Sequence, residues 1–126
     1  MPYTLNYENA GFIRLVYEGE ANLNDMKEVI ARGVALASEK NCLRILSDFR
    51  SMRLNLSIMD LYSIPSLQKS QGILLNSPFY QYKRAVIVPT EDYKKYKFFE
   101  DVAVNRAHKI KIFTDEAEAV HWLLQP

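Results

Sequence analysis

The chain has 126 residues, of which 48% are hydrophobic and 25% charged, and this predicts a single compact domain over residues 1–126 with an ordinary core. Its 16 basic and 15 acidic residues give a net charge of +1, which excludes the strongly basic surface that nucleic acids or anionic membranes require. We therefore expect no nucleic acid among its partners.

The beginning of the chain carries no targeting signal that we can identify. Residues 1–8 contain neither a basic segment nor an apolar one, so we expect no secretory signal. Nowhere does the sequence approach the roughly 18 consecutive apolar residues of a membrane-spanning helix. Cys42 is the single cysteine, which excludes an intramolecular disulfide and a zinc site of paired cysteines. These features predict a cytoplasmic protein without integral membrane association.

Apolar and polar residues alternate over residues 3–8 and again over residues 13–18, as they do in half-buried strands. The intervening Asn9-Ala10-Gly11 is a turn signal, so we expect a β-hairpin. Its first strand, with Tyr3, Leu5 and Tyr7, would lie at the edge of a sheet. Because an uncovered edge strand can pair with another chain, a symmetric homodimer is one expectation.

A helix is predicted over about residues 24–40, because Asn22 or Asn24 provides an N-cap and apolar residues recur at helical spacing. A mostly apolar strand follows over residues 43–49. The succession of strand, helix and strand is a crossover connection, which implies that the strands it joins run parallel.

The middle of the chain predicts a second helix and then a loop. Ser57-Ile58-Met59-Asp60 resembles a capping box, so a helix over residues 58–75 is expected to begin there. Pro65 would kink or split this helix near Ile64. Residues 72–82 read as an exposed loop before a strand over residues 83–89.

The last third predicts two further helices around one strand. Thr90 caps a helix that extends to about Arg106, and a strand follows over residues 109–112. Thr114 or Asp115 then caps the final helix. The resulting order, ββαβαβαβα, predicts an α/β fold with a mostly parallel sheet and a first strand that is antiparallel.

The C-terminal part of the sequence resembles a known group of domains. Phe98-Phe99-Glu100-Asp101 lies in a predicted helix, and a strand that ends in Phe113 leads to an acidic helix start and an Ala-Val-His-Trp-Leu segment at residues 119–123. This pattern resembles the SpoIIAA-like domains, which include the STAS regulators and are similar to the CRAL-TRIO lipid carriers. The resemblance implies a superhelix of β-α units, with about five strands and about four helices mainly on one sheet face, in a regulatory or carrier domain that is not an enzyme.

In the STAS regulators, a partner kinase phosphorylates a serine at the start of the helix that follows the third strand. The corresponding segment here is residues 52–58. It lacks the Asp-Ser-Ser-Gly signature: Asn55 stands in place of the aspartate, Leu56 takes the next position, and Ser57 offers the one hydroxyl. The resemblance therefore predicts a regulatory domain without a clear phosphorylation switch. The alternative role for Ser57 is that of a helix N-cap.

A candidate rim for a ligand or a partner comes from the ends of the parallel strands, because ligands of open parallel sheets lie beyond their carboxyl ends. These ends bring Asp48 and Ser51 near Pro89-Thr90 and Phe113-Thr114. The predicted rim consists of Asp48, Arg50, Ser51, Asn55 and Ser57. An ordinary surface ion pair is the alternative role for Asp48 and Arg50.

An unusual number of aromatic residues predicts a core, a subunit interface, or an apolar pocket under a loop that acts as a lid. The residues that would line such a pocket are Leu54, Leu56, Tyr62, Phe79, Tyr80, Phe98 and Phe99.

The sequence contains no motif for catalysis, a metal or a cofactor that we would assign. Cys42, His108 and His121 are the candidates for a nucleophile and its base, but their spacing does not place them together. The four glycines are too far apart for a phosphate-binding loop. We therefore expect no cofactor and no metal.

Two functions follow from the sequence. The first is a non-catalytic regulatory or scaffolding domain that binds a protein partner through the rim. The second is a binder or carrier of a small apolar, lipid-like molecule that occupies the aromatic pocket.

Overall fold

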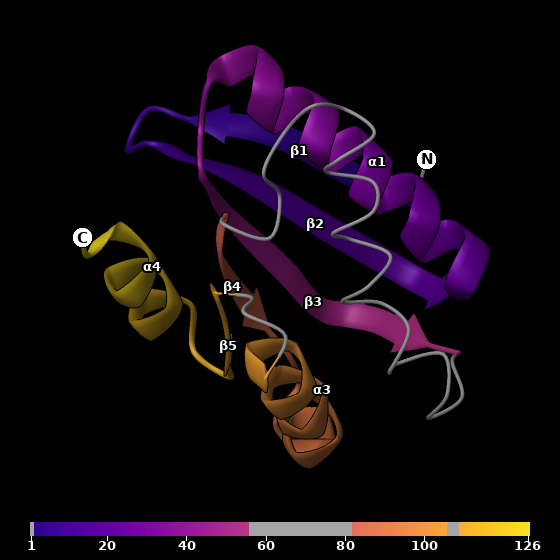
Figure 1. Cartoon of the computed structure of the whole chain (residues 1–126). Coiled ribbons are helices and arrows are strands. Elements are labelled where there is room, and N and C mark those ends of the chain that lie inside the picture. Colours follow the sequence, from indigo (N-terminus) through magenta and orange to yellow (C-terminus); the bar gives the residue numbers. More distant parts are fainter. Residues whose placement is uncertain (1, 56–81, 106–108) are drawn as a thin grey trace.

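The computed structural model describes residues 2–55, 82–105 and 109–126, which form a five-stranded sheet in the order β1-β2-β3-β4-β5 (Figure 1). The strands are β1 (Tyr3–Glu8), β2 (Phe12–Ala21), β3 (Arg44–Leu54), β4 (Lys83–Ile87) and β5 (Lys109–Phe113). β1 pairs antiparallel with β2, and every other pair of neighbouring strands is parallel. The predicted α/β fold with one antiparallel strand is confirmed.

The described helices are α1 (Leu23–Lys40), α3 (Tyr93–Asn105) and α4 (Glu116–Leu124), and a short 3-10 turn, Thr90–Asp92, precedes α3. α1 and α3 share one core against the sheet, whereas α4 packs against the other face. The helices therefore lie mainly on one face, as predicted. The predicted helix over residues 58–75 and the loop over residues 72–82 fall almost entirely outside the described residues. None of the described helices combines the length and apolar character needed to cross a bilayer.

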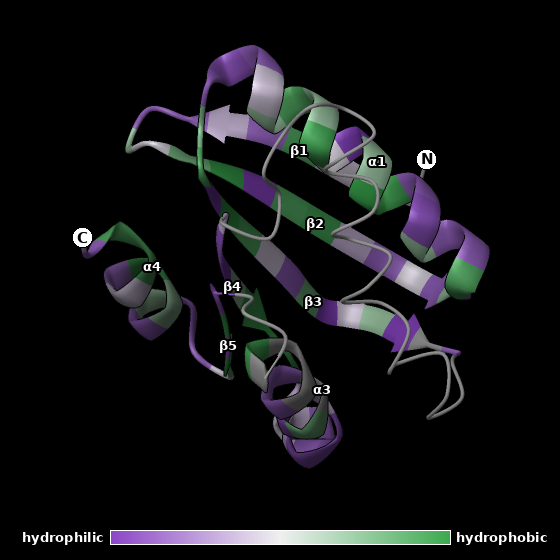
Figure 2. Ribbon diagram, in the orientation of Figure 1, coloured by the Kyte–Doolittle hydropathy of each residue, from purple (hydrophilic) through white to green (hydrophobic). Residues whose placement is uncertain are grey.

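The larger core lies beneath α1 and α3. The apolar residues of α1 are buried at helical spacing, as the sequence predicts: they are Met26, Val29, Ile30, Val34 and Ala37. They pack with inward residues of the sheet such as Ile13, Leu15 and Ile45. Figure 2 shows hydrophobic residues where α1 meets the sheet and hydrophilic residues near the end of β2. Each fully buried Val, Leu or Ile contributes about 1.5–3 kcal/mol to the free energy of unfolding.

The smaller core lies between α4 and the opposite face of the sheet. Ala119 and Leu123 of α4 contact a patch made of Phe12, Leu46, Ala85, Ile87 and Phe113. β4 therefore has apolar residues on both faces, and residues 85–88 form a continuous apolar run rather than an alternating one. Continuous runs are typical of parallel strands that are covered on both sides.

β3 is longer than the sequence predicts, because it continues from the expected end at Phe49 to Leu54. Its pairing with β4 stops at Asp48, and residues 51–54 pair only with β2. One face of this extension is solvent-exposed, so polar residues alternate with the buried Met52 and break the apolar run. Arg50 and Ser51 consequently lie within the strand, and their predicted position beyond its end is wrong.

A bulge shapes this extension. Val16 pairs with Asp48 and Glu18 pairs with Ser51, so β3 uses one more residue than β2 over this interval. Such an insertion bends the strand and increases its twist. Gly19 follows on β2 with a φ of 90°, a conformation that L side chains rarely adopt. As a result, Arg50 and Ser51 are both exposed, whereas Phe49 and Met52 are both buried.

α3 covers the edge of the sheet at β5. The buried carboxylate of Glu100 accepts a hydrogen bond from the Ile112 amide through Oε1, at 2.8 Å, and one from the Lys97 ammonium through Oε2. An edge amide that would otherwise point out of the sheet is thereby satisfied. Covering an edge in this way prevents another strand from adding to it.

We expect Asn22→Ala to lower the free energy of unfolding by about 1 kcal/mol, because Asn22 caps α1. Its Oδ1 accepts from the Asp25 amide at 2.9 Å, and the Asp25 carboxylate accepts from the Asn22 amide at 2.9 Å. Urea unfolding followed by circular dichroism measures the change. Asn24→Ala is the matched control, because the Asn24 side chain has no hydrogen bond to a described residue. An equal loss in both variants would contradict the capping role.

Candidate functional site

Asp48 and Arg50 form a bidentate ion pair on the outward face of β3. Arg50 Nε donates to Asp48 Oδ1 at 2.9 Å and Arg50 Nη2 donates to Asp48 Oδ2 at 2.7 Å. The Arg50 amide also donates to Asp48 Oδ1, at 3.2 Å. Residues two apart on a strand share a face, which explains why they meet.

Two further elements extend this pair into a network. Glu116, in the first turn of α4, accepts from both Arg50 Nη2 and Arg14 Nη1 through its Oε1, each at 3.2 Å. Arg14 of β2 in turn donates from Nε to Glu8 of β1 at 2.9 Å. The network therefore ties β1, β2, β3 and α4 together. Sequence reasoning missed Arg14, Glu116 and Glu8, although the alternation of β2 already placed Arg14 on the outward face.

Arg50 favours the ionised form of Asp48. The side-chain hydrogen bond from Arg50 lowers the pKa of Asp48, and this effect outweighs the opposing effect of burial. The same bond raises the pKa of the Arg50 guanidinium. A carboxylate with a lowered pKa is a poor general acid, and the contacts of Asp48 with Arg50 give it a structural role.

The other predicted rim residues lie apart from this network. Ser51 is exposed on β3, and Asn55 lies just after the strand, where its Nδ2 donates to Glu20 Oε1 at 3.0 Å. The structure thus divides the predicted rim: Asp48 and Arg50 adjoin α4, whereas Ser51 and Asn55 lie at the far end of the β2–β3 ribbon. Ser57 lies outside the described residues.

The structure describes three of the seven residues that were predicted to line the apolar pocket. Phe98 is 42% exposed on α3. Leu54 is the last residue of β3, and Phe99 belongs to α3. The remaining four residues, Leu56, Tyr62, Phe79 and Tyr80, lie outside the described residues. The aromatic pocket therefore stays a prediction.

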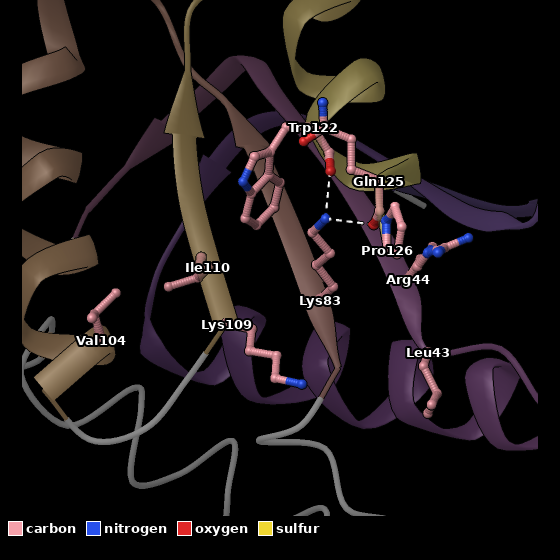
Figure 3. A pocket seen from close by; sticks show the side chains of 9 residues that line it. All are labelled: Leu43, Arg44, Lys83, Val104, Lys109, Ile110, Trp122, Gln125 and Pro126. Atoms are coloured by element: carbon pink, nitrogen blue, oxygen red, sulfur yellow. Dashed lines mark hydrogen bonds between the residues drawn. The ribbon is translucent and has the colours of Figure 1, made fainter.

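The described residues form a pocket elsewhere, which the sequence did not predict (Figure 3). Its volume is about 540 Å³, and it lies at the amino-terminal ends of β3, β4 and β5, beside the end of α4. Its lining consists of Leu43, Arg44, Lys83, Val104, Lys109, Ile110, Trp122, Gln125 and Pro126.

Lys83 lies at the centre of this pocket. Its ammonium donates to the carbonyl oxygens of Trp122 and Gln125, the latter at 2.8 Å, and lies 4.4 Å from the centroid of the Trp122 ring. Burial lowers the pKa of Lys83, and the neighbouring charges of Arg44 and Lys109 lower it further. A cation at this position suits the negative end of the α4 dipole.

The candidate nucleophile and base are not brought together by the described residues. Cys42 is buried, and its Sγ donates to the carbonyl oxygens of Gly11, at 3.5 Å, and Arg44, at 3.4 Å. His121 is exposed on α4, with its Nε2 2.9 Å from the Gln125 side-chain nitrogen. His108 lies outside the described residues. Within the described ranges, His, Cys, Asp and Glu form no group of three that could hold a metal ion.

Solved structures identify the architecture. An uncharacterised DUF3478-family protein from Shewanella loihica PV-4, with a SpoIIAA-like fold, matches with a TM-score of 0.57 and 18% identity over 96% of this chain and 91% of its own. Bacillus SpoIIAA in its phosphorylated form matches with a TM-score of 0.50 and 14% identity, over 95% of this chain and 97% of its own. This chain has a SpoIIAA-like fold.

The other comparisons do not extend the likeness beyond the SpoIIAA-like fold. The unphosphorylated form of the anti-sigma factor antagonist SpoIIAA matches with a TM-score of 0.48 and 12% identity, over 82% of this chain and 96% of its own. No protein-family model matches the sequence, and no curated protein matches it significantly. The likeness to these solved structures therefore establishes the fold of this chain and not its function.

We expect Arg50→Ala to lower the free energy of unfolding by about 1 kcal/mol at neutral pH, since the ion pair is partly exposed. The folded-state pKa of Asp48 lies below its ordinary value of 3.8, so the pair stabilises the protein above that value and loses this effect as the pH falls through the lowered pKa. The difference between wild type and variant should therefore shrink below about pH 4.

Urea unfolding at a series of pH values measures this difference. Arg32→Ala, on the exposed face of α1, serves as the control and should show no such convergence with wild type at acid pH. A difference for Arg50→Ala that stays constant down to the lowest pH would contradict the role of the Asp48 pair.

Proposed function

We propose that this chain is a non-catalytic regulatory or scaffolding domain that binds a protein partner through the exposed end of the β2–β3 ribbon. This surface, the ribbon tip, consists of Glu18, Glu20, Ser51, Arg53 and Asn55, all of which are exposed. The observation that carries the proposal is the projection of β3 by six residues, 49–54, beyond its last residue paired with β4, Asp48 (Figure 1).

The chemistry of the ribbon tip suits a protein surface better than an apolar ligand. The tip carries two carboxylates, Glu18 and Glu20, and one guanidinium group, that of Arg53, which lies opposite Glu20. Complementary charges of both signs give a protein interface its specificity and speed its formation. Arginine is also among the residues that contribute most to protein interfaces.

The SpoIIAA-like fold supports the same class of function. SpoIIAA is an anti-sigma factor antagonist with a phosphorylated form, and the resemblance to STAS regulators places the phosphorylated serine after the third strand. In this chain, Ser57 follows Asn55 by two residues, although the regulators' signature is absent. We therefore propose partner binding at the ribbon tip without a clear phosphorylation switch.

A second mode of protein contact is pairing of two copies through β1. This strand forms the outer edge of the described sheet, and Tyr7 on it is exposed. A homodimer of this kind would leave the ribbon tip available, because β1 pairs only with residues 12–17 of β2 and the tip lies beyond that pairing.

We expect Arg53→Glu to weaken binding of the partner at least tenfold, because reversing an interfacial charge replaces attraction with repulsion. The tagged protein is used to capture binding proteins from the cells that produce it. The captured protein is then purified, and its dissociation constant is measured for wild type and variants.

Arg32→Glu is the matched control, since it makes the same change of charge on the exposed face of α1. It should bind as wild type does. The proposal fails if the wild-type protein captures no stoichiometric partner, or if both variants lose affinity equally.

A further inference from the structure

Three basic residues stand in one row across the amino-terminal ends of the parallel strands. Arg44 pairs in register with Lys83, and Lys83 pairs in register with Lys109. Neighbouring strands are about 4.8 Å apart, and in-register residues share a face. Like charges directly opposite one another destabilise a sheet. Burial lowers the pKa of Lys83, and repulsion from Arg44 and Lys109 lowers it further.

The end of α4 compensates the positive charge of Lys83, at the middle of the row. It does not compensate the charges of Arg44 and Lys109 on either side. Lys83 donates to the carbonyl oxygens of Trp122 and Gln125 and lies against the Trp122 ring. Neither Arg44 nor Lys109 forms an ion pair with a carboxylate of the described residues. Arg44 and Lys109, which form no ion pair with a described residue, therefore lie on either side of Lys83 within one pocket.

The same pocket exposes apolar side chains. Leu43 is 54% exposed and Val104 is 52% exposed, and Figure 3 shows them at opposite ends of the pocket with Trp122 between the strands and α4. The volume of about 540 Å³ falls within the range of small-molecule sites. The apolar body of an occupant would shield the apolar lining beside Trp122, and its charged group would neutralise the outer cations.

We propose that this pocket binds a small amphipathic anion. A phosphate or carboxylate group lies over the row, where Arg44 and Lys109 approach it from either side of Lys83, and an aromatic or aliphatic body lies against Trp122. Charge-assisted hydrogen bonds from arginine and lysine are among the strongest that hold such groups. The site is separate from the ribbon tip: Arg44 and Leu54 are the two ends of β3, about 33 Å apart at the usual rise per residue.

Trp122 is the single tryptophan of the chain, so its fluorescence reports on this pocket directly. The probes are phenyl phosphate and benzoate, with phenol as the neutral counterpart of the first. We expect at least one of the two anions to change the Trp122 emission saturably, to bind at least tenfold more tightly than phenol, and to bind more weakly as salt is added. Comparison of phenyl phosphate with benzoate identifies the preferred anionic group. Equal binding of phenol and both anions would overturn the proposal.

Substitutions test the role of the row. Arg44→Gln and Lys109→Gln should each weaken binding of the better anion about tenfold, because each removes a charged hydrogen-bond donor. Lys109→Arg, which keeps the charge, should retain most of the affinity. Lys95→Gln makes the same loss of charge on the exposed surface of α3 and is the control.

Thermal unfolding without ligand provides an independent readout. Since each glutamine variant relieves repulsion within the row, its melting temperature should equal or exceed that of wild type. Unchanged affinity in both glutamine variants would overturn the proposal, and so would an equal loss in Lys95→Gln. None of these outcomes bears on partner binding at the ribbon tip, so the two proposals can fail separately.

Discussion

The burial of β4 on both of its faces joins the two halves of the structure. Val86 belongs to the core beneath α1 and α3, whereas Ala85 and Ile87 belong to the core beneath α4. Because alternate residues of one strand point in opposite directions, a shift of β4 by one residue would exchange these two sets and disrupt both cores. The position of every parallel strand, and of the side chains carried on them, is therefore set by packing around this strand.

That fixed register creates the two features that distinguish the surface. On β3, it ends the pairing with β4 at Asp48 and leaves the rest of the strand to project with β2 alone. At the other end of the strands, it places Arg44, Lys83 and Lys109 side by side. Hydrophobic packing elsewhere in the molecule thus maintains an arrangement of like charges that is unfavourable by itself, as is common at binding sites.

The sequence was sufficient for the fold but not for the surfaces. Periodicity and capping residues predicted β1, α1 and α4 closely, because each depends on local signals such as the N-caps at Asn22 and Asp115. The extension of β3 was missed because one of its faces is exposed and interrupts the apolar run. The contacts of Glu116 with Arg14 and Arg50, and the pocket around Lys83, join segments that are distant in the chain, so no local pattern could reveal them.

The hydrogen bond from the Ile112 amide to Glu100 limits how copies of this molecule can assemble. Unlimited fibre growth by strand addition needs two receptive borders, one on each side of every sheet. Here α3 and the Glu100 carboxylate occupy the border at β5, so of the two outermost strands of the described sheet, β1 is the one left to accept a strand. Association of this kind ends with two molecules joined into one continuous ten-stranded sheet, twice the five strands of a single chain. Removal of the Glu100 carboxylate would expose the second border and open a route to filaments.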